Sequence, residues 1–430
     1  MVIKILLVLL GILCSFKGRN NIIYISYFIL PFTDMGGIRF INISFFDLFR
    51  YMCFIPMLIV FAIDILEKRK STNREFIYIS IALIYLFSYI LTRYVISIHP
   101  DKSNLITIIA AGFILFLYIL YNSKYIDMDK IQLITMIIIG IEVYLAINQA
   151  LGKTTSEIVP FVYSTIGEND YIELSNFYRA IGSQGDPNHY AMLLGILTAS
   201  LINQLNKIHV KIFFTMGLIG LLFGFSRMGI VIFFILITIC IVKYFKNSKK
   251  SYLTMSLLFF SIPIIVLFVM AIVTNSQSQI FIANIIQRFQ EDSFRGAMAA
   301  GSRRWIIHNY FNNILNIKNF IFGLGLQNFE YELFKMTGIH LVAHNQYIQM
   351  LADIGILGYI PILIIIIIIN KKDLKSNKVN PFWISIMILL ISNLFLITTY
   401  LLYIYSFLGL YVACKIKNSQ YEEIKEVSSN

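Results

Sequence analysis

The stretch HNQYIQMLADIGILGY, residues 344–359, is followed almost at once by LIIIIII, residues 363–369. The apolar part, residues 346–369, is long enough to cross the roughly 20-residue span of a bilayer core as one helix. A helix built for lipid does not normally begin with three polar residues. His344 and the two residues after it therefore either cap the helix at the membrane interface or belong to a functional site.

The whole chain has the composition of a membrane protein. Of its 430 residues 58% are hydrophobic and 13% are charged, and the mean hydropathy is +0.75, which excludes a soluble domain of this size. The four cysteines lie in apolar segments and show no disulfide or metal-binding spacing. We expect an all-α polytopic membrane protein, a single integral membrane domain over residues 1–430 with about 12–14 transmembrane helices. The expected crossings are 2–16, 21–33, 43–66, 75–98, 104–121, 131–151, 188–205, 212–226, 229–245, 253–273, 346–369, 381–397 and 400–414.

The net charge of +12 is explained by membrane topology and requires no nucleic-acid partner. Short lysine-rich clusters separate the apolar segments, and placing all of them in the cytoplasm gives a consistent alternation of the crossings. This topology puts the tail, residues 415–430, in the cytoplasm. It puts two long loops, residues 152–187 and 274–343, on the outer side. Connections of this length are usually functional, so we expect partly folded caps over the membrane domain.

The outer side is rich in arginine, although orientation in the membrane requires only positive charge on the inner side. A guanidinium group holds phosphate through two parallel hydrogen bonds and stays charged when it is desolvated. The outer arginines therefore predict an anionic ligand, with lipid headgroups or salt bridges within the loops as the alternative. They are Arg39, Arg179, Arg227, Arg288, Arg295, Arg303 and Arg304.

Two short motifs lie at expected helix ends on this side. In GSQGDPNHYAMLLGI, residues 182–196, Gly185-Asp186-Pro187-Asn188 is a turn in which Asn188 can cap the next helix and Asp186 sits just before it. The alternative is that these residues face a ligand. In FGFSRMGIVIF, residues 223–233, two apolar segments meet at a tight hairpin. Arg227 is thereby placed at the outer interface, where an arginine is costly and indicates a functional site. A snorkelling interfacial anchor is the alternative.

A third motif, GSRRWIIHNYFNNILNI, residues 301–317, predicts an amphipathic helix with Ser302 as its N-cap. Arg303 and Arg304 in the first turn oppose the helix dipole, so a purely structural helix gains nothing from them. An anion would be held there by free N–H groups and both guanidinium groups. The turn Gly323-Leu324-Gly325 would bring backbone close to a ligand. The expected apolar face is Ile306, Ile307, Tyr310, Phe311, Ile314 and Leu315, and the expected polar lane is Arg304, His308, Asn312 and Asn316.

His344 stands where the large loop enters the next helix. On a helix that begins there, Tyr347, Leu351 and Gly355 share its face. Gly355 and Gly358 would permit close approach of a neighbouring helix. A histidine titrates near neutral pH, and one that faces anion-holding arginines is suited to act as a general base. The alternative is an interfacial histidine hydrogen-bonded to the loop backbone.

The motifs, taken in order, resemble the O-antigen ligase/polymerase superfamily. The resemblance covers residues 180–370, while the first 130 residues match only in hydropathy. The family often has a single arginine a few residues before the tryptophan, so either Arg303 or Arg304 takes that role. The residues that carry the resemblance are Pro187-Asn188 with Ala191, Ser226-Arg227 with Gly229, Arg303-Arg304-Trp305, Gly323 with Gly325, and Ala343-His344-Asn345 followed by Gln349, Gly355 and Gly358.

The resemblance implies a membrane glycosyltransferase of GT-C-like architecture on the outer side of a bacterial cytoplasmic membrane. Its donor would be an oligosaccharide on undecaprenyl diphosphate, and its partners would be membrane lipid, a chain-length regulator and a flippase. The implied reaction inverts the anomeric centre without a metal or other cofactor, because arginines stabilise the leaving diphosphate and a histidine takes the acceptor proton. The implied catalytic residues are His344, Arg227, Arg303 and Arg304, and the implied substrate-binding residues are Arg179, Asp186, Asn188, Arg288, His308 and Asn345.

Three functions remain open at this point. A polymerase would transfer the growing chain to a new lipid-linked repeat unit and so make O-antigen or capsule, and we favour it. A ligase would transfer the chain to lipid A–core. A flippase or other transporter is the third, indicated by Glu142 and Arg50 within apolar runs. A transporter would have its site near the middle of the membrane, whereas a transferase would have it at the outer ends of the helices.

Overall fold

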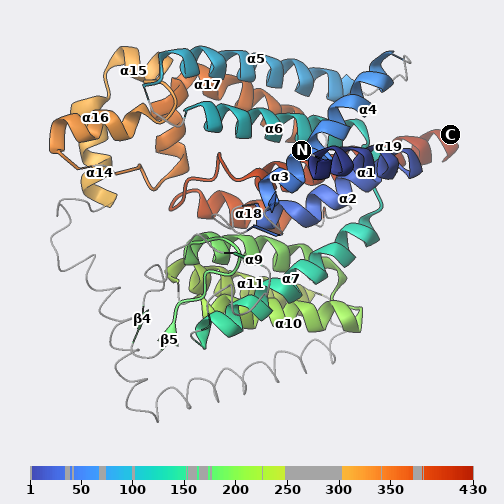
Figure 1. Ribbon diagram of the computed structural model, residues 1–430. Helices are drawn as coiled ribbons and strands as arrows, with labels where there is room; N and C mark the ends of the chain where they lie inside the picture. Colours follow the sequence, from blue (N-terminus) through green and yellow to red (C-terminus); the bar gives the residue numbers. More distant parts are fainter. Residues whose placement is uncertain are drawn as a thin grey trace, which may run out of the picture.

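A computed structural model gives the fold of the chain (Figure 1). It describes residues 2–33, 39–40, 43–66, 74–98, 102–151, 153, 162–163, 173–174, 177–224, 226–246, 303–339, 341–370, 380 and 382–429. The α-helices are α1 (Val2–Lys17), α2 (Asn20–Ile29), α3 (Phe45–Phe49), α4 (Ile55–Leu66), α5 (Arg74–Ile96), α6 (Lys102–Tyr121), α7 (Met128–Ala150), α9 (Pro187–Leu201), α10 (Ile208–Phe223), α11 (Arg227–Lys246), α14 (Arg303–Asn309), α15 (Ile317–Phe322), α16 (Asn328–Thr337), α17 (Gln346–Asn370), α18 (Trp383–Ser392) and α19 (Leu402–Ser429). Short 3₁₀ helices are η1 (Leu30–Phe32), η3 (Ser123–Tyr125) and η5 (Ile202–Gln204), and π-helical turns are η2 (Arg50–Phe54) and η6 (Tyr310–Ile314).

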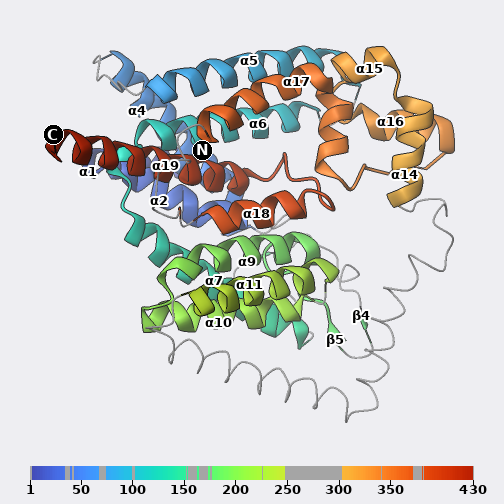
Figure 2. The same cartoon turned by 180° about the vertical axis from the view of Figure 1, so that it is seen from behind.

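The long helices lie side by side, with α14, α15 and α16 at one end of the molecule and the C-terminus at the other (Figures 1 and 2). Among the described residues, the helices long and apolar enough to cross a membrane are Phe45–Asp64, Phe76–Ile96, Ser103–Tyr121, Met128–Ala150 and Gln346–Ile368. The protein is therefore an all-α polytopic membrane protein, as the sequence predicts. The number of crossings stays a prediction, and the expected crossing 253–273 lies outside the described residues.

The strands of the described residues are two residues long and lie in the loops. β1 (Arg39–Phe40) pairs with β2 (Ile43–Ser44) and with β3 (Val162–Tyr163), and β4 (Glu173–Leu174) pairs with β5 (Phe177–Tyr178), all antiparallel. The loop that precedes α9 is thus joined to the loop that follows α2.

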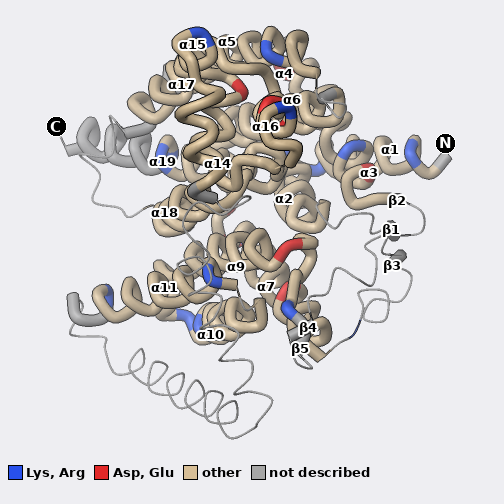
Figure 3. The backbone as a smooth tube through the Cα atoms, turned by 90° about the vertical axis from the view of Figure 1, so that its left-hand side faces the viewer, with Lys and Arg blue, Asp and Glu red and all other residues tan. Residues whose placement is uncertain are grey.

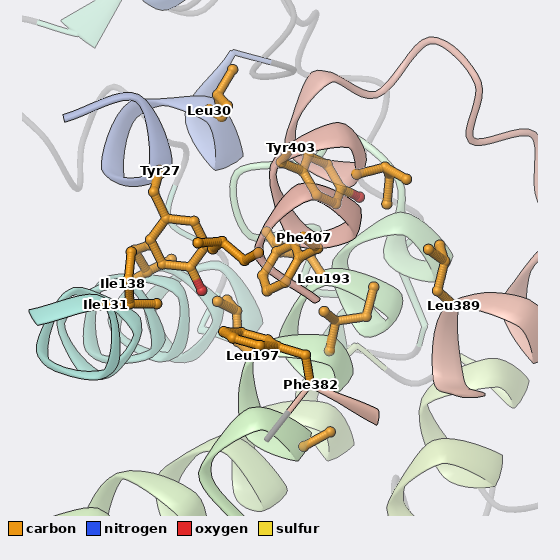
Figure 4. Packing of buried hydrophobic residues seen from close by; sticks show 14 of the residues in the cluster. Tyr27, Leu30, Ile131, Ile138, Leu193, Leu197, Phe382, Leu389, Tyr403 and Phe407 are labelled. Atoms are coloured by element: carbon orange, nitrogen blue, oxygen red, sulfur yellow. The ribbon is translucent and has the colours of Figure 1, made fainter. Parts of the chain in front are cut away.

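The largest core joins the first and last helices to the middle of the chain. Tyr27 of α2 and Phe407 of α19 make an edge-to-face contact with ring centroids 5.4 Å apart. The hydroxyl groups of Tyr27 and Thr135, on α7, share a hydrogen bond of 2.8 Å. Figure 4 shows these rings beside Leu193 and Leu197 of α9, a helix that is buried along almost all of its length. The buried helix α9 therefore provides a fixed support for the loop that precedes it.

Helix α17 differs from the single unbroken crossing that the sequence predicts. Gly355 has φ 61° and ψ −174°, which is not a helical conformation, and the helix is broken there. Figures 1 and 2 show the first part of α17 turned away from the second part, which runs beside α5. A methyl group on Gly355 would lie 2.5 Å from the backbone nitrogen of Gly323. The prediction is wrong here because a glycine in an apolar run looks the same whether it packs a helix or breaks one.

We define the cap as residues 303–339 and 341–354, which are α14, η6, α15, α16 and the first part of α17. Its core is small and separate from the main core. Asn328 fastens it to the end of α5, because its side-chain oxygen accepts from the N–H of Ile98 at 2.9 Å. The hydroxyl of Ser97 also donates to the carbonyl of Leu326 at 2.6 Å. The cap end of the molecule faces the viewer in Figure 3.

Candidate functional site

The loop before α9 is held inside the bundle by α7. The side-chain oxygen of Gln149 accepts hydrogen bonds from the N–H groups of Ile181 and Gly182 at 3.0 and 2.8 Å. The carboxylate of Glu142, which is fully buried, accepts from the N–H of Ser183 at 3.0 Å and also from its hydroxyl. These bonds satisfy the loop backbone where water is excluded. Glu142 therefore has a structural partner in this loop.

Two helix starts meet beside the loop. Asp186 caps α9, and its carboxylate accepts from two N–H groups of the first turn at 2.7 and 3.1 Å. Asn188 is half-buried in the same turn. Ser226 caps α11 by accepting from the N–H of Gly229 at 2.8 Å. A methyl group on Gly229 would lie 3.3 Å from the side chain of Ala191, so α11 approaches α9 closely at this point.

Arg179 and Arg227 flank a single turn. Arg227 is the first residue of α11 and is exposed. The N–H of Ala180, which follows Arg179, donates to the carbonyl of Phe223, the last residue of α10, at 3.1 Å. The turn between α10 and α11 is thus followed directly by Arg227, and it binds the backbone of Ala180, the residue after Arg179. Two cations are thus carried by adjoining segments, and guanidinium groups suit an anion.

The end of α18 joins this corner to the start of α17. The hydroxyl of Ser392, at the end of α18, donates to the sulfur of Met228, the second residue of α11, at 3.7 Å. The carbonyl of Asn393 accepts from the N–H of Gln346, the first residue of α17, at 2.8 Å. In Figure 3, α9, α11 and α18 lie next to one another at this end. The starts of α11 and α17 are therefore linked through the end of α18.

His344 is exposed at the turn into α17, and its polar neighbours hold that turn. Its φ is 48°, in the left-handed region, which costs a non-glycine residue on the order of 1–3 kcal/mol and persists only where surrounding contacts fix it. Asn345 accepts from the N–H of Ile348 at 3.1 Å and donates to a carbonyl just after α18 at 3.1 Å. Gln346 accepts from the backbone N–H groups of residues 398–399. Two of the three polar residues are thus anchors, and His344 is the exposed one of the three.

Gln349 and Asp353 form a buried pair behind His344. The side-chain oxygen of Gln349 accepts from the N–H of Ala343 at 3.4 Å, and its amide donates to Asp353 at 3.0 Å. The same carboxylate oxygen accepts from the N–H of Gln327 at 2.9 Å. The backbone just before His344 is therefore tied to a carboxylate that also holds the cap.

The Gly323-Leu324-Gly325 turn approaches α17, where the sequence analysis expects it to approach a ligand. The N–H of Leu324 donates to the carbonyl of Ala352 at 2.6 Å, and that of Gly325 to the carbonyl of Asp353 at 3.1 Å. The break in α17 releases these carbonyls from the helical pattern, so the turn satisfies them. Gly323 has φ 78°, and a methyl group on it would lie 2.5 Å from the carbonyl oxygen of Asp353.

Arg303 and Arg304 begin α14, as the sequence predicts, and the structure describes their backbone. Ile306 is buried in the cap core with Tyr310, whereas Phe311 is exposed, contrary to prediction. The reason is that α14 passes into the π-turn η6 and ends there, so its apolar stripe does not continue at the expected spacing.

The cap core lies against the segment that carries His344. Tyr310 packs with Ala343 and Ile348 among others in this core. Burial, and after it the Asp353 carboxylate, raises the pKa of Tyr310 to about 12, so its phenol stays neutral at physiological pH. His308 is exposed on the opposite side of α14 and shares a hydrogen bond of 2.9 Å with Asn312, as the predicted polar lane requires.

Residues 212–363 match the family model described as O-Antigen ligase. The resemblance to the O-antigen ligase/polymerase superfamily is confirmed. Comparisons with curated proteins and with solved structures gave no match. The matched segment runs from α10 to the second part of α17 and contains Arg227 and His344, whereas Arg179 and the N-cap of α9 precede it.

The structure brings most of the predicted site residues to the cap end. Arg179, Asp186, Asn188 and Arg227 lie at the corner of α9 and α11. His344 and Asn345 are joined to that corner through α18, and α14 carries Arg303, Arg304 and His308. Arg288 and the expected N-cap Ser302 lie outside the described residues. Within the described parts of the chain, no group of three or more His, Cys, Asp or Glu side chains could hold a metal ion.

Sequence reasoning missed the residues that hold the site. The motif resemblance includes Gln349 but assigns it no role, and no motif contains Asp353 or Gln149. The available signal was an acid or amide within an apolar helix, because such groups are costly in the membrane unless they have a partner.

Proposed function

We propose that this protein, of O-antigen ligase/polymerase type, polymerises undecaprenyl-diphosphate-linked oligosaccharide repeat units on the outer face of the cytoplasmic membrane. The observation that carries the proposal is the linkage of Arg179, Arg227 and His344 at one end of the bundle. Transfer from a lipid diphosphate requires cations for the leaving group and a base for the acceptor, and this end of the bundle carries both.

In the proposed reaction, the oxygen of an acceptor hydroxyl attacks the anomeric carbon of the donor sugar. The bond between that carbon and the diphosphate oxygen breaks, and undecaprenyl diphosphate leaves with both bonding electrons. The proton of the hydroxyl passes to the ring of His344. Attack opposite the leaving group inverts the anomeric configuration.

The arginines have the task of stabilising the charge that develops on the diphosphate. Arg227 at the start of α11 and Arg179 beside the same turn are two such cations, and α14 brings Arg303 and Arg304 to the same end. A guanidinium group needs no metal to hold a phosphate oxygen pair. The proposed reaction is therefore independent of divalent metal.

The ligase reaction is the second candidate, and the description of the matched family favours it. Transfer to lipid A–core uses the same donor and the same base, so the site geometry serves both reactions. A transporter has less support, because Glu142 binds the loop at Ser183 and Arg50 is exposed with its guanidinium over the ring of Tyr51.

The test is a reconstituted reaction with the full-length protein and a defined undecaprenyl-diphosphate repeat unit, with and without lipid A–core. A ladder of products from the donor alone supports a polymerase, and a product that requires lipid A–core identifies a ligase. No product in either case contradicts the proposal. Arg227→Gln should abolish the product, whereas Lys207→Gln, a matched loss of charge at the opposite end of α10, should retain it.

A further inference from the structure

Helix α15 (Ile317–Phe322) of the cap exposes several large apolar side chains. On α15, Ile317 is 81% exposed, Phe320 41% and Phe322 43%. Apolar surface left in water costs about 25 cal/mol for each Å², and soluble surfaces rarely gather such residues on one short helix. The helix contains no acidic residue, and its one cation, Lys318, is exposed among the apolar side chains.

Helix α15 is fastened to the end of the membrane-crossing helix α5. The carbonyl of Phe322 accepts from the hydroxyl of Tyr89 at 2.8 Å and from the guanidinium of Arg93 at 2.9 Å. The exposed apolar face of α5 continues past this point, and Val95 is 74% exposed. Figures 1 and 2 show α15 beside this end of α5.

The exposed apolar residues of α15 and α5 therefore adjoin. Because α5 crosses the membrane, the environment of this surface is lipid. A crossing helix presents such a face to acyl chains. The aromatic residues and cations at its end, Tyr89 and Arg93 together with Phe320 and Lys318, are the residue types that gather at the membrane–water interface. The guanidinium of Arg93 lies 5.1 Å from the ring centroid of Tyr89.

We propose that α15 lies in the headgroup region of the membrane leaflet at the cap end. Ile317 and Phe320, three residues apart on one face, contact the upper acyl chains, and Lys318 and Arg93 contact lipid phosphate groups. The cap is thereby held at a fixed depth by a short interfacial helix.

Helix α16 provides the internal comparison. It also exposes apolar residues, including Tyr331 at 40%, but it carries Glu330, Glu332 and Lys335. Figure 3 shows α15 at the perimeter of the bundle and α16 over its end. We therefore place α16 in water and α15 in lipid, although Tyr331 and Phe320 are almost equally exposed.

The depth of α15 has a consequence that rests on the proposed function. The Gly323 turn follows α15 directly and binds the broken part of α17, which leads back to His344. An interfacial α15 keeps this turn close to the headgroup level, where the diphosphate of a lipid-linked donor lies.

The test uses nitroxide labels on the full-length protein in lipid nanodiscs, after its four cysteines are replaced. Labels are attached at Ile317→Cys and Phe320→Cys on α15 and at Tyr331→Cys on α16. Collision with oxygen, which partitions into lipid, is compared with collision with a water-soluble nickel chelate. If the cysteine-free chain does not fold, Phe320→Trp and Tyr331→Trp are compared in a background in which Trp305 and Trp383 are replaced by Phe, by quenching with lipids brominated near the headgroup.

We expect oxygen to relax the labels on α15 several-fold more than the nickel chelate does, with the reverse order at residue 331. In the alternative measurement, brominated lipid should quench the tryptophan at 320 and not the one at 331. Equal nickel access at 317, 320 and 331, or equal quenching at 320 and 331, would overturn the proposal. Neither readout involves catalysis, so the proposed function and this inference fail independently.

Discussion

Gln349 is the residue through which the placement of His344 can be tested most sharply. Gln349→Met keeps the length and most of the volume of the side chain but removes its hydrogen bonds to Ala343 and Asp353. Asp353 still accepts from the N–H of Gln327, whereas the buried N–H of Ala343 has lost this acceptor. Leaving one buried donor unsatisfied costs about 1–3 kcal/mol, which a protein of this size tolerates.

The expected effect on activity is larger than the effect on stability. The left-handed turn at His344 is held by its neighbours, so loss of the Gln349 bond allows it to relax. A displacement of about 1 Å in a catalytic group costs on the order of 100-fold in rate. We expect polymer formation by Gln349→Met to fall by that order, with membrane insertion unchanged. As a control, Gln132→Met replaces a buried glutamine near the start of α7, away from His344. It should leave the rate within a few-fold of the original.

The assay is a double-mutant cycle with His344→Ala. If Gln349 acts only by placing His344, adding Gln349→Met to His344→Ala lowers the residual rate no further. Two results would refute the reasoning. One is full activity of Gln349→Met, and the other is an equal loss in the presence and absence of the His344 ring, which would indicate a general structural defect.

Three further outcomes are expected. Gly323→Ala should lower the unfolding temperature strongly, because its methyl group would meet the α17 backbone. Gly338→Ala is the control: its φ is 72° and no atom lies within 4 Å of the added methyl group, so it should cost only about 1 kcal/mol of strain. Equal shifts of the two variants in a thermal melt would contradict this. Asp186→Ala should lower the free energy of unfolding by about 0.5–2 kcal/mol through loss of the helix cap. Asp186→Ser should restore both the stability and the product. A stable but inactive Asp186→Ser protein would instead show that Asp186 acts on the substrate. Product formation should continue in EDTA, and a loss that Mg²⁺ or Mn²⁺ restores would disprove metal independence.

The parts of the fold that depend on local pattern were predictable from the sequence. Apolar segments near the length of a bilayer gave the helices, because lipid demands that composition along a whole crossing. A cap at the start of α9 was predictable, but the sequence favours Asn188 as the capping residue, whereas in the structure Asp186 accepts from the first free N–H groups. The start of α14 at Arg303 followed from an apolar period of helical length.

The parts that depend on distant partners were not predictable. The bonds from Gln346 to residues 398–399 and from Glu142 to Ser183 join segments that share no periodicity. The break at Gly355 depends on the carbonyls that the Gly323 turn satisfies, and neither segment reveals the other. The candidate site was predicted as a set of residue types, but its supporting hydrogen bonds appear only when the chain is folded.

The substitution His344→Gln tests the central claim most directly. Glutamine retains hydrogen bonding but does not accept a proton at neutral pH, and loss of a general base costs about 10²–10⁴-fold in rate. We predict that the full-length His344→Gln protein binds undecaprenyl diphosphate normally and forms almost no product. His209→Gln, which replaces an exposed histidine in the first turn of α10 at the opposite end, should form product at the original rate. Near-normal product from a well-folded His344→Gln protein would contradict the assignment of His344 as the base.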